Sequence, residues 1–166
     1  MEQLITKTLE ALNIMSESEQ KVAEFYRLCS EKFEEHCSFW EALAREEAGH
    51  AEVIKKLIAL VSIHPSEFIP GKSLPVEAIK SFIMRTQANI DTVKRGDLPE
   101  SKALLMAYHI ENTFIEVQYA DVVRTENEDY KLLLGQVISD TLKHKTRVMA
   151  RMTKQKEAAK PSKKPS

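Results

Sequence analysis

Apolar residues recur at steps of three and four along most of this 166-residue chain, and this spacing restricts the fold to packed amphipathic helices. Only four glycines and six prolines interrupt the pattern, and 43% of the residues are apolar, which is enough for one helical core. We therefore predict an all-α fold, with residues 1–156 forming one bundle domain and residues 157–166 forming a basic disordered tail.

Start and stop signals divide the chain into four long helices and one shorter helix. These helices are predicted at about residues 3–34, 38–62, 76–96, 99–124 and 130–156. Tight turns join the first two and the last two long helices, while a Pro-rich segment and the short helix lie between the two pairs. Two helical hairpins joined by one long crossover make a four-helix bundle of the ferritin-like arrangement.

Two capping-box patterns bear on where these helices begin. Ser38 and Glu41 predict the start of the second long helix. Ser16 and Glu19 form the same pattern, which leaves open whether the first dozen residues make a separate short helix.

An internal repeat relates the two hairpins. A shift of 92 residues places Glu19 over Glu111, and a two-residue length change in the turn then places His50 over His144. Each hairpin therefore offers a Glu on its first helix and a His on its second. Glu47 lies three residues before His50, so both can address one metal ion from the same helix face. Carboxylates with one imidazole per metal suit iron or manganese in a bundle core.

The segments "ESEQKVAEFY" and "FWEALAREEAGHAEVIKKL" resemble the rubrerythrin-like branch of the ferritin-like superfamily. The resemblance covers residues 9–62 well and residues 100–152 more weakly. It implies a four-helix di-iron protein, and many members of the family reduce peroxide or react with oxygen. The metal ligands that it implies are Glu19, Glu47, His50, Glu111 and His144.

The second hairpin departs from this pattern at one ligand position. Thr141 stands where the second Glu-x-x-His motif would have its Glu, so one bridging or terminal carboxylate is missing. Asp140 could share a face with His144, but its match in the repeat is Glu46, which points about 100° away from the ligand Glu. Whether Asp140 replaces the missing ligand therefore stays open.

Two further departures concern redox chemistry. Phe114 replaces an additional Glu found in rubrerythrins proper, and no C-x-x-C pair provides a built-in iron relay. Any electrons would have to come from an external donor protein.

Two functions follow from these observations. The first is an iron protein, of the di-iron type or with a single ion, that handles peroxide or oxygen as an oxidoreductase; manganese and zinc are alternative metals. The second is a degenerate member that binds one metal ion or none and serves as an assembly or partner-binding scaffold. Thr141 favours the second function, and the five other ligand-type residues favour the first. No catalytic residue is assigned.

Composition suggests a cytoplasmic protein. The N-terminus lacks a secretory hydrophobic region, no apolar run reaches membrane-spanning length, and Cys29 and Cys37 fit reduced thiols. Residues 143–166 carry nine Lys or Arg and one acid, but no aromatic residue lies among them, so we expect neither nucleic-acid nor membrane binding. Helical hairpins of this size often dimerise, and we expect a homodimer.

The remaining histidines and the large apolar residues have ordinary structural interpretations. His109 is predicted to face away from the Glu and His positions, and Tyr26 and Trp40 are predicted to pack in the core. Met149 and Met152, at helical spacing, are predicted to fill the core.

Overall fold

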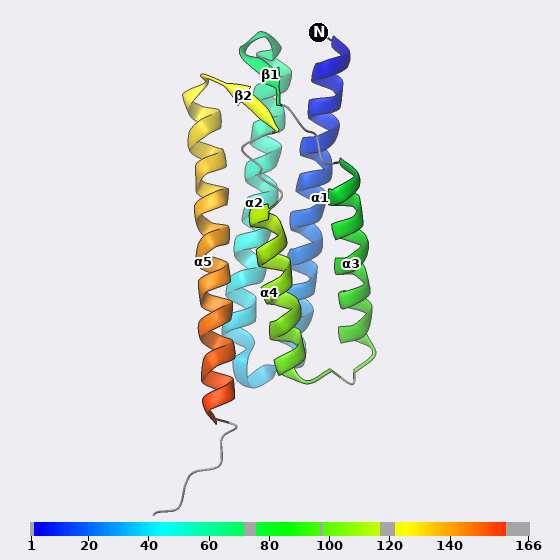
Figure 1. Ribbon diagram of the computed structural model, residues 1–166, viewed down its shortest axis with the longest axis vertical. Coiled ribbons are helices and arrows are strands. Elements are labelled where there is room, and N and C mark those ends of the chain that lie inside the picture. Colours follow the sequence, from blue (N-terminus) through cyan, green and yellow to red (C-terminus); the bar gives the residue numbers. More distant parts are fainter. Residues whose placement is uncertain (1, 72–75, 97, 117–121, 159–166) are drawn as a thin grey trace, which may run out of the picture.

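The computed structural model describes residues 2–71, 76–96, 98–116 and 122–158 (Figure 1). The predicted all-α class is confirmed. The helices are α1 (Glu2–Lys32), α2 (Cys37–Ile63), α3 (Val76–Lys94), α4 (Glu100–Glu116) and α5 (Glu128–Ala158), with 3-10 turns at Glu34–His36 and Pro65–Glu67. Helix α5 thus extends two residues into the predicted tail, whose remaining residues, 159–166, lie outside the described part of the chain.

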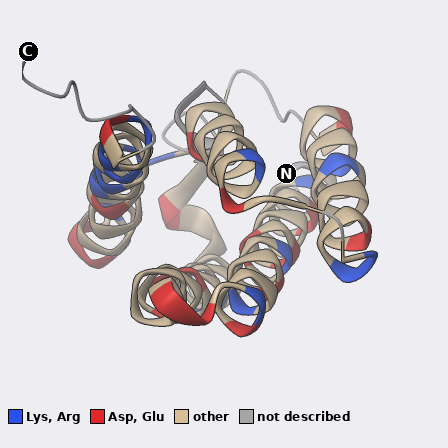
Figure 2. Ribbon diagram, turned by 90° about the horizontal axis from the view of Figure 1, so that it is seen from below, with Lys and Arg blue, Asp and Glu red and all other residues tan. Residues whose placement is uncertain are grey.

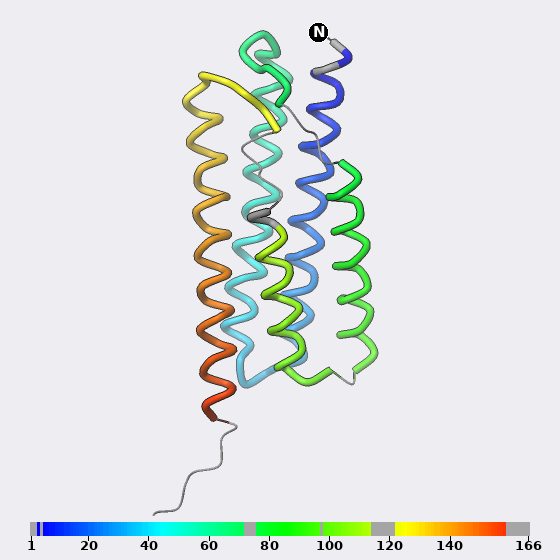
Figure 3. The backbone as a smooth tube through the Cα atoms, in the orientation of Figure 1, coloured from blue at the N-terminus to red at the C-terminus, as the bar shows by residue number. Residues whose placement is uncertain are grey.

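The helices form two antiparallel hairpins, α1 with α2 and α4 with α5 (Figure 1). Between them α3 runs along α1 and brings the chain back to the end of the molecule at which α2 began (Figure 3). Helix α4 therefore runs in the same direction as α2, and α2 packs against α5. Seen along the helix axes, the helices lie side by side as a bundle (Figure 2).

Helix α1 is continuous through the first capping-box pattern. The Ser16 hydroxyl donates to the Ala51 carbonyl oxygen of α2 at 3.3 Å, and the Ser18 hydroxyl donates to the Met15 carbonyl oxygen at 2.7 Å. Helix α1 runs without a break from Glu2 to Lys32, so no separate N-terminal helix forms. The second pattern predicts the start of α2 to within one residue, since α2 begins at Cys37. Ser38 is not the capping residue, because that position is taken by His36, which makes no side-chain cap.

The predicted helix over residues 99–124 is too long. The described part of helix α4 covers Glu100–Glu116, and residues 117–121 of the predicted helix lie outside the described residues. Val123–Thr125 forms a strand, β2, that pairs antiparallel with β1 (Phe68–Pro70). Phe68 and Val123 are buried, and Phe68 lies opposite Thr125 in the ribbon. The β-branched sequence "VVRT" finds hydrogen-bonding partners in the distant Pro-rich segment, and these override its helical spacing.

The core lies between the two hairpins. Tyr26 and Trp40 are fully buried there, as predicted, with ring centroids 5.9 Å apart. Gly96, two residues beyond the end of α3, has φ of +98°, a left-handed conformation that glycine adopts readily after a helix. His109 is exposed as predicted, but Met149 is 48% exposed, so its assignment to the core is wrong.

Among the described residues, none of the helices combines the length and hydrophobicity needed to cross a lipid bilayer.

Candidate metal centre

Four helices converge on a group of buried acidic and imidazole side chains halfway along the bundle. Helix α1 contributes Glu19, α2 contributes Glu47 and His50, α4 contributes Glu111, and α5 contributes His144. None of the five is more than 5% exposed. All five residues predicted as ligands therefore lie inside the bundle. Burying such polar groups costs free energy of folding unless they are paired or hold an ion.

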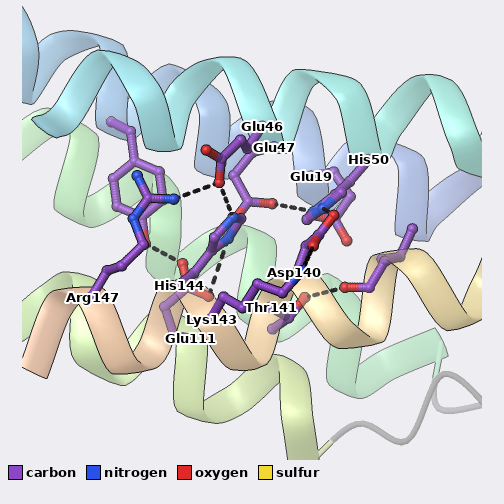
Figure 4. A network of polar contacts seen from close by, with 12 residues as sticks. Glu19, Glu46, Glu47, His50, Glu111, Asp140, Thr141, Lys143, His144 and Arg147 are labelled. Carbon is purple, nitrogen blue, oxygen red and sulfur yellow. Dashed lines mark hydrogen bonds and ion pairs between the residues drawn. The ribbon is translucent and has the colours of Figure 1, made fainter. Parts of the chain in front are cut away.

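Glu47 is at the centre of this group (Figure 4). One of its carboxylate oxygens, Oε2, lies 2.9 Å from Nδ1 of His50, and the other, Oε1, lies 2.7 Å from Nδ1 of His144. The two imidazole rings stack with centroids 5.3 Å apart. A single carboxylate thus connects the histidines of the two hairpins.

Glu19 and Glu111 flank the centre on opposite sides. Oε2 of Glu19 lies 4.0 Å from Nδ1 of His50, and Oε2 of Glu111 lies 3.8 Å from Nδ1 of His144. Each hairpin therefore brings its own Glu toward its own His, in agreement with the pairing in the sequence repeat. Both flanking carboxylates approach the ring nitrogen that also faces Glu47.

Two further carboxylates lie at the outer ring nitrogens. Oε2 of Glu46 lies 2.6 Å from Nε2 of His144 and 2.6 Å from Nη1 of Arg147, while Oδ2 of Asp140 lies 3.8 Å from Nε2 of His50. The sequence interpretation missed the role of Glu46, although the repeat pairs it with Asp140. Asp140 is 42% exposed and faces the outer nitrogen, so it does not occupy the position of the missing ligand.

Thr141 is buried beside this network but does not take part in it. Its hydroxyl donates to the Val137 carbonyl oxygen of its own helix at 2.9 Å. The hydroxyl is therefore turned along α5, and the inner face of α5 presents one imidazole and no carboxylate to the centre.

Burial and neighbouring groups shift the pKa values of the residues in this network in different directions. Burial would raise the pKa of Glu47, but hydrogen bonds from His144 and His50 lower that pKa to about 2. Burial would likewise lower the pKa of His144, yet the adjacent Glu47 carboxylate raises it to about 9. Burial and the charge of Glu47 raise the pKa of Glu111 well above its ordinary value. Without a metal, the protonated His144 balances the charge of Glu47.

Tyr26 connects α1 to this network through Glu111. Its buried hydroxyl donates to Oε1 of Glu111, leaving Oε2 of that carboxyl without a hydrogen-bond partner among the described residues. Burial and the neighbouring Glu111 raise the pKa of Tyr26 well above its ordinary value, so the phenol stays protonated and remains a donor. The sequence interpretation placed Tyr26 in the core but assigned it no contact with the site.

A Tyr26→Phe variant tests this contact. We expect the free energy of unfolding to fall by about 1–3 kcal/mol, because the buried Glu111 carboxyl loses its hydrogen-bond donor. Denaturant titration of the metal-free protein measures the change. Tyr130→Phe is the matched control, since the buried Tyr130 hydroxyl has no partner among the described residues and its removal should cost nothing. Equal losses in the two variants would contradict the proposed contact.

The donor atoms fit a bound metal ion. Glu47, His50 and His144 each present one donor, and these atoms all lie within 4.8 Å of one another. Donors bound to one ion at about 2.1 Å lie about 3–3.5 Å apart. The observed 2.7 and 2.9 Å join the two histidines to different oxygens of Glu47, so the side chains would have to turn toward a common point to hold one ion. Oε2 of Glu111, buried and without a hydrogen-bond partner in the described structure, offers an additional ligand. Fold and site together define an all-α helical bundle with a buried Glu and His cluster able to hold a metal ion.

No family model, curated protein or solved structure matches this chain.

Proposed function

We propose that this chain is a rubrerythrin-like, metal-binding member of the ferritin-like superfamily. The observation that carries the proposal is the position of Glu47, whose two oxygens each face Nδ1 of a histidine from a different hairpin. A carboxylate that faces two imidazoles in a bundle core could share a metal ion with either of them. Carboxylate and imidazole donors suit iron, and also manganese or zinc.

The topology supports the same proposal. Two antiparallel hairpins are joined by a crossover that contains α3, which runs beside part of α1, and α2 and α4 are parallel (Figure 1). This connectivity agrees with a ferritin-like bundle, in which inward-facing Glu and His side chains of facing helices hold the metal.

Each side chain would have a distinct part in holding the metal. Glu47 and the two histidines are the central ligands, and Glu19 and Glu111 complete the set from either side. Glu46, at the outer nitrogen of His144, fixes the orientation of that ring and strengthens it as a ligand. Bound iron would supply the electron transfer needed to reduce peroxide or oxygen, with the electrons delivered by a separate donor protein.

One observation favours a second function, that of a scaffold without redox activity. Thr141 contributes no carboxylate, and the ion pairs of Glu47 and His144 already balance charge inside the bundle in the absence of a metal. A chain that had lost its metal would keep such a network for its contribution to folding.

Metal titration of the purified protein distinguishes the two functions. We expect iron(II), manganese(II) or zinc(II) to bind at about one equivalent per chain and to raise the melting temperature. His144→Ala should abolish binding, while His109→Ala, an exposed histidine on α4, should leave it unchanged. Binding equal in all three proteins would exclude the buried centre and leave the scaffold function. Peroxide consumption by the iron form with a supplied reductant then tests the redox activity.

A further inference from the structure

Helix α5 carries a second pattern on the side that faces away from the metal centre. Seven positions follow one another at alternating steps of three and four, and all are exposed: Leu132, Gly135, Ser139, Leu142, Thr146, Met149 and Thr153. We call these residues the outer stripe. Alternating steps of three and four are the spacing of a coiled-coil seam, in which side chains of one helix pack into spaces on another.

The outer stripe exposes large apolar side chains that nothing in the described structure covers. Leu132, Leu142 and Met149 are 64%, 48% and 48% exposed. His144 and Thr141, by contrast, are buried on the inward side of the same helix. Helix α5 lies at the edge of the bundle, so the outer stripe is open along its length (Figure 1).

The stripe also contains an open position for a large side chain. Apart from the adjacent residues and the nearby backbone of α5 itself, no described atom lies within 4 Å of the place where a Cβ at Gly135 would be. Gly135 and Met149 are each seven residues from Leu142, on opposite sides of it. A two-fold axis through Leu142 would therefore place Gly135 opposite Met149 of the partner subunit.

The charges of α5 specify the direction of such a pairing. The first half of the helix carries Glu128, Asp129 and Asp140 against Lys131, whereas residues 143–158 carry six Lys or Arg against Glu157 alone. Figure 2 shows blue Lys and Arg along the helix that leads into the C-terminal trace. Two parallel copies would bring their basic halves together, but two antiparallel copies place each acidic half against a basic one. Glu128 and Lys156, each fourteen residues from Leu142, would then lie opposite one another across the two copies.

We propose that the outer stripe is a homodimer interface, in which α5 packs antiparallel against α5 of a second copy about a two-fold axis at Leu142. The paired segment from Glu128 to Lys156 extends about 42 Å, or about four heptads. Self-complementary apolar spacing and charge make a second copy of this chain the occupant. The proposal does not depend on metal binding.

Sedimentation velocity tests whether the interface exists. The unmodified protein should sediment as a dimer, and Leu142→Lys should raise the dissociation constant by more than about 100-fold, because it removes two leucines and adds two like charges at the axis. Ile63→Lys, at an apolar residue that is 68% exposed on α2, should leave the dimer intact. A monomeric unmodified protein, or a dimer insensitive to Leu142→Lys, would overturn the proposal.

Cysteine cross-linking tests the direction and register. In a Cys37→Ser background, which removes the exposed native thiol, Leu142→Cys should form an intermolecular disulfide under oxidation. Leu132→Cys should not, since the two copies of residue 132 would lie about 30 Å apart. Cross-linking at both positions would show a parallel pair, and cross-linking at neither would show another interface; either result contradicts the proposal.

Discussion

A Glu47→Gln variant is expected to lose more than about 100-fold in metal affinity, a larger loss than replacement of a residue outside the ligand set produces. The amide keeps the shape of the side chain but carries no charge and offers one oxygen instead of two. It therefore cannot serve both His50 and His144, whose Nδ1 atoms face the two oxygens of the native carboxylate. Competition between the protein and a chelator of known affinity measures the loss.

Glu52→Gln is the matched control for this variant. Glu52 is an exposed residue on the same helix and pairs only with Lys55 among the described residues, so its neutralisation should leave metal affinity unchanged. Circular dichroism would verify that both variants keep their helices. If Glu47→Gln binds metal as tightly as Glu52→Gln does, the ion is held elsewhere on the protein.

A Thr141→Glu variant is expected to raise the metal content from about one ion toward about two per chain, because it adds the carboxylate missing from the inner face of α5. Without metal, the same change should lower the free energy of unfolding by about 3 kcal/mol, since it buries a further acid near Glu47 and Glu111. Bound metal should reverse this loss, so the melting temperature should depend on metal far more steeply than that of the unmodified protein.

Elemental analysis and thermal unfolding, with and without added metal, measure both effects. Thr141→Gln introduces a side chain of the same size as Glu but without its charge. It should therefore lose the stability that the larger side chain costs but gain no bound metal. Equal stoichiometry in Thr141→Glu and Thr141→Gln would mean that the second position fails for another reason. Two bound ions in the unmodified protein would show that Thr141 does not limit the number of metal ions that the site holds.

The helices and the candidate site residues could be identified from the sequence because both depend on the spacing of residues along the chain. Apolar residues at steps of three and four predicted the helical class, and Glu47 and His50 share a helix face simply by being three residues apart. The repeat then matched Glu19 with Glu111 and His50 with His144, and the structure buries all five of these residues.

Other features depend on neighbours that are distant in sequence. Val123–Thr125 lies in a segment predicted as helix, but in the structure it forms a strand paired with Phe68–Pro70. Met149 has the spacing of a core residue, but its exposure depends on which side of α5 the other helices cover. Periodicity defines the faces of a helix without showing which of them another helix buries.

The sequence by itself determined that this protein is helical and that it carries Glu and His at positions suited to a metal. Only the tertiary structure decided which atoms meet. It placed Glu47 between the Nδ1 atoms of two histidines, assigned Glu46 to the outer nitrogen of His144, and turned the Thr141 hydroxyl back onto its own helix. The physical reason is that helical spacing orients side chains within one helix, whereas their partners depend on how separate helices pack against one another.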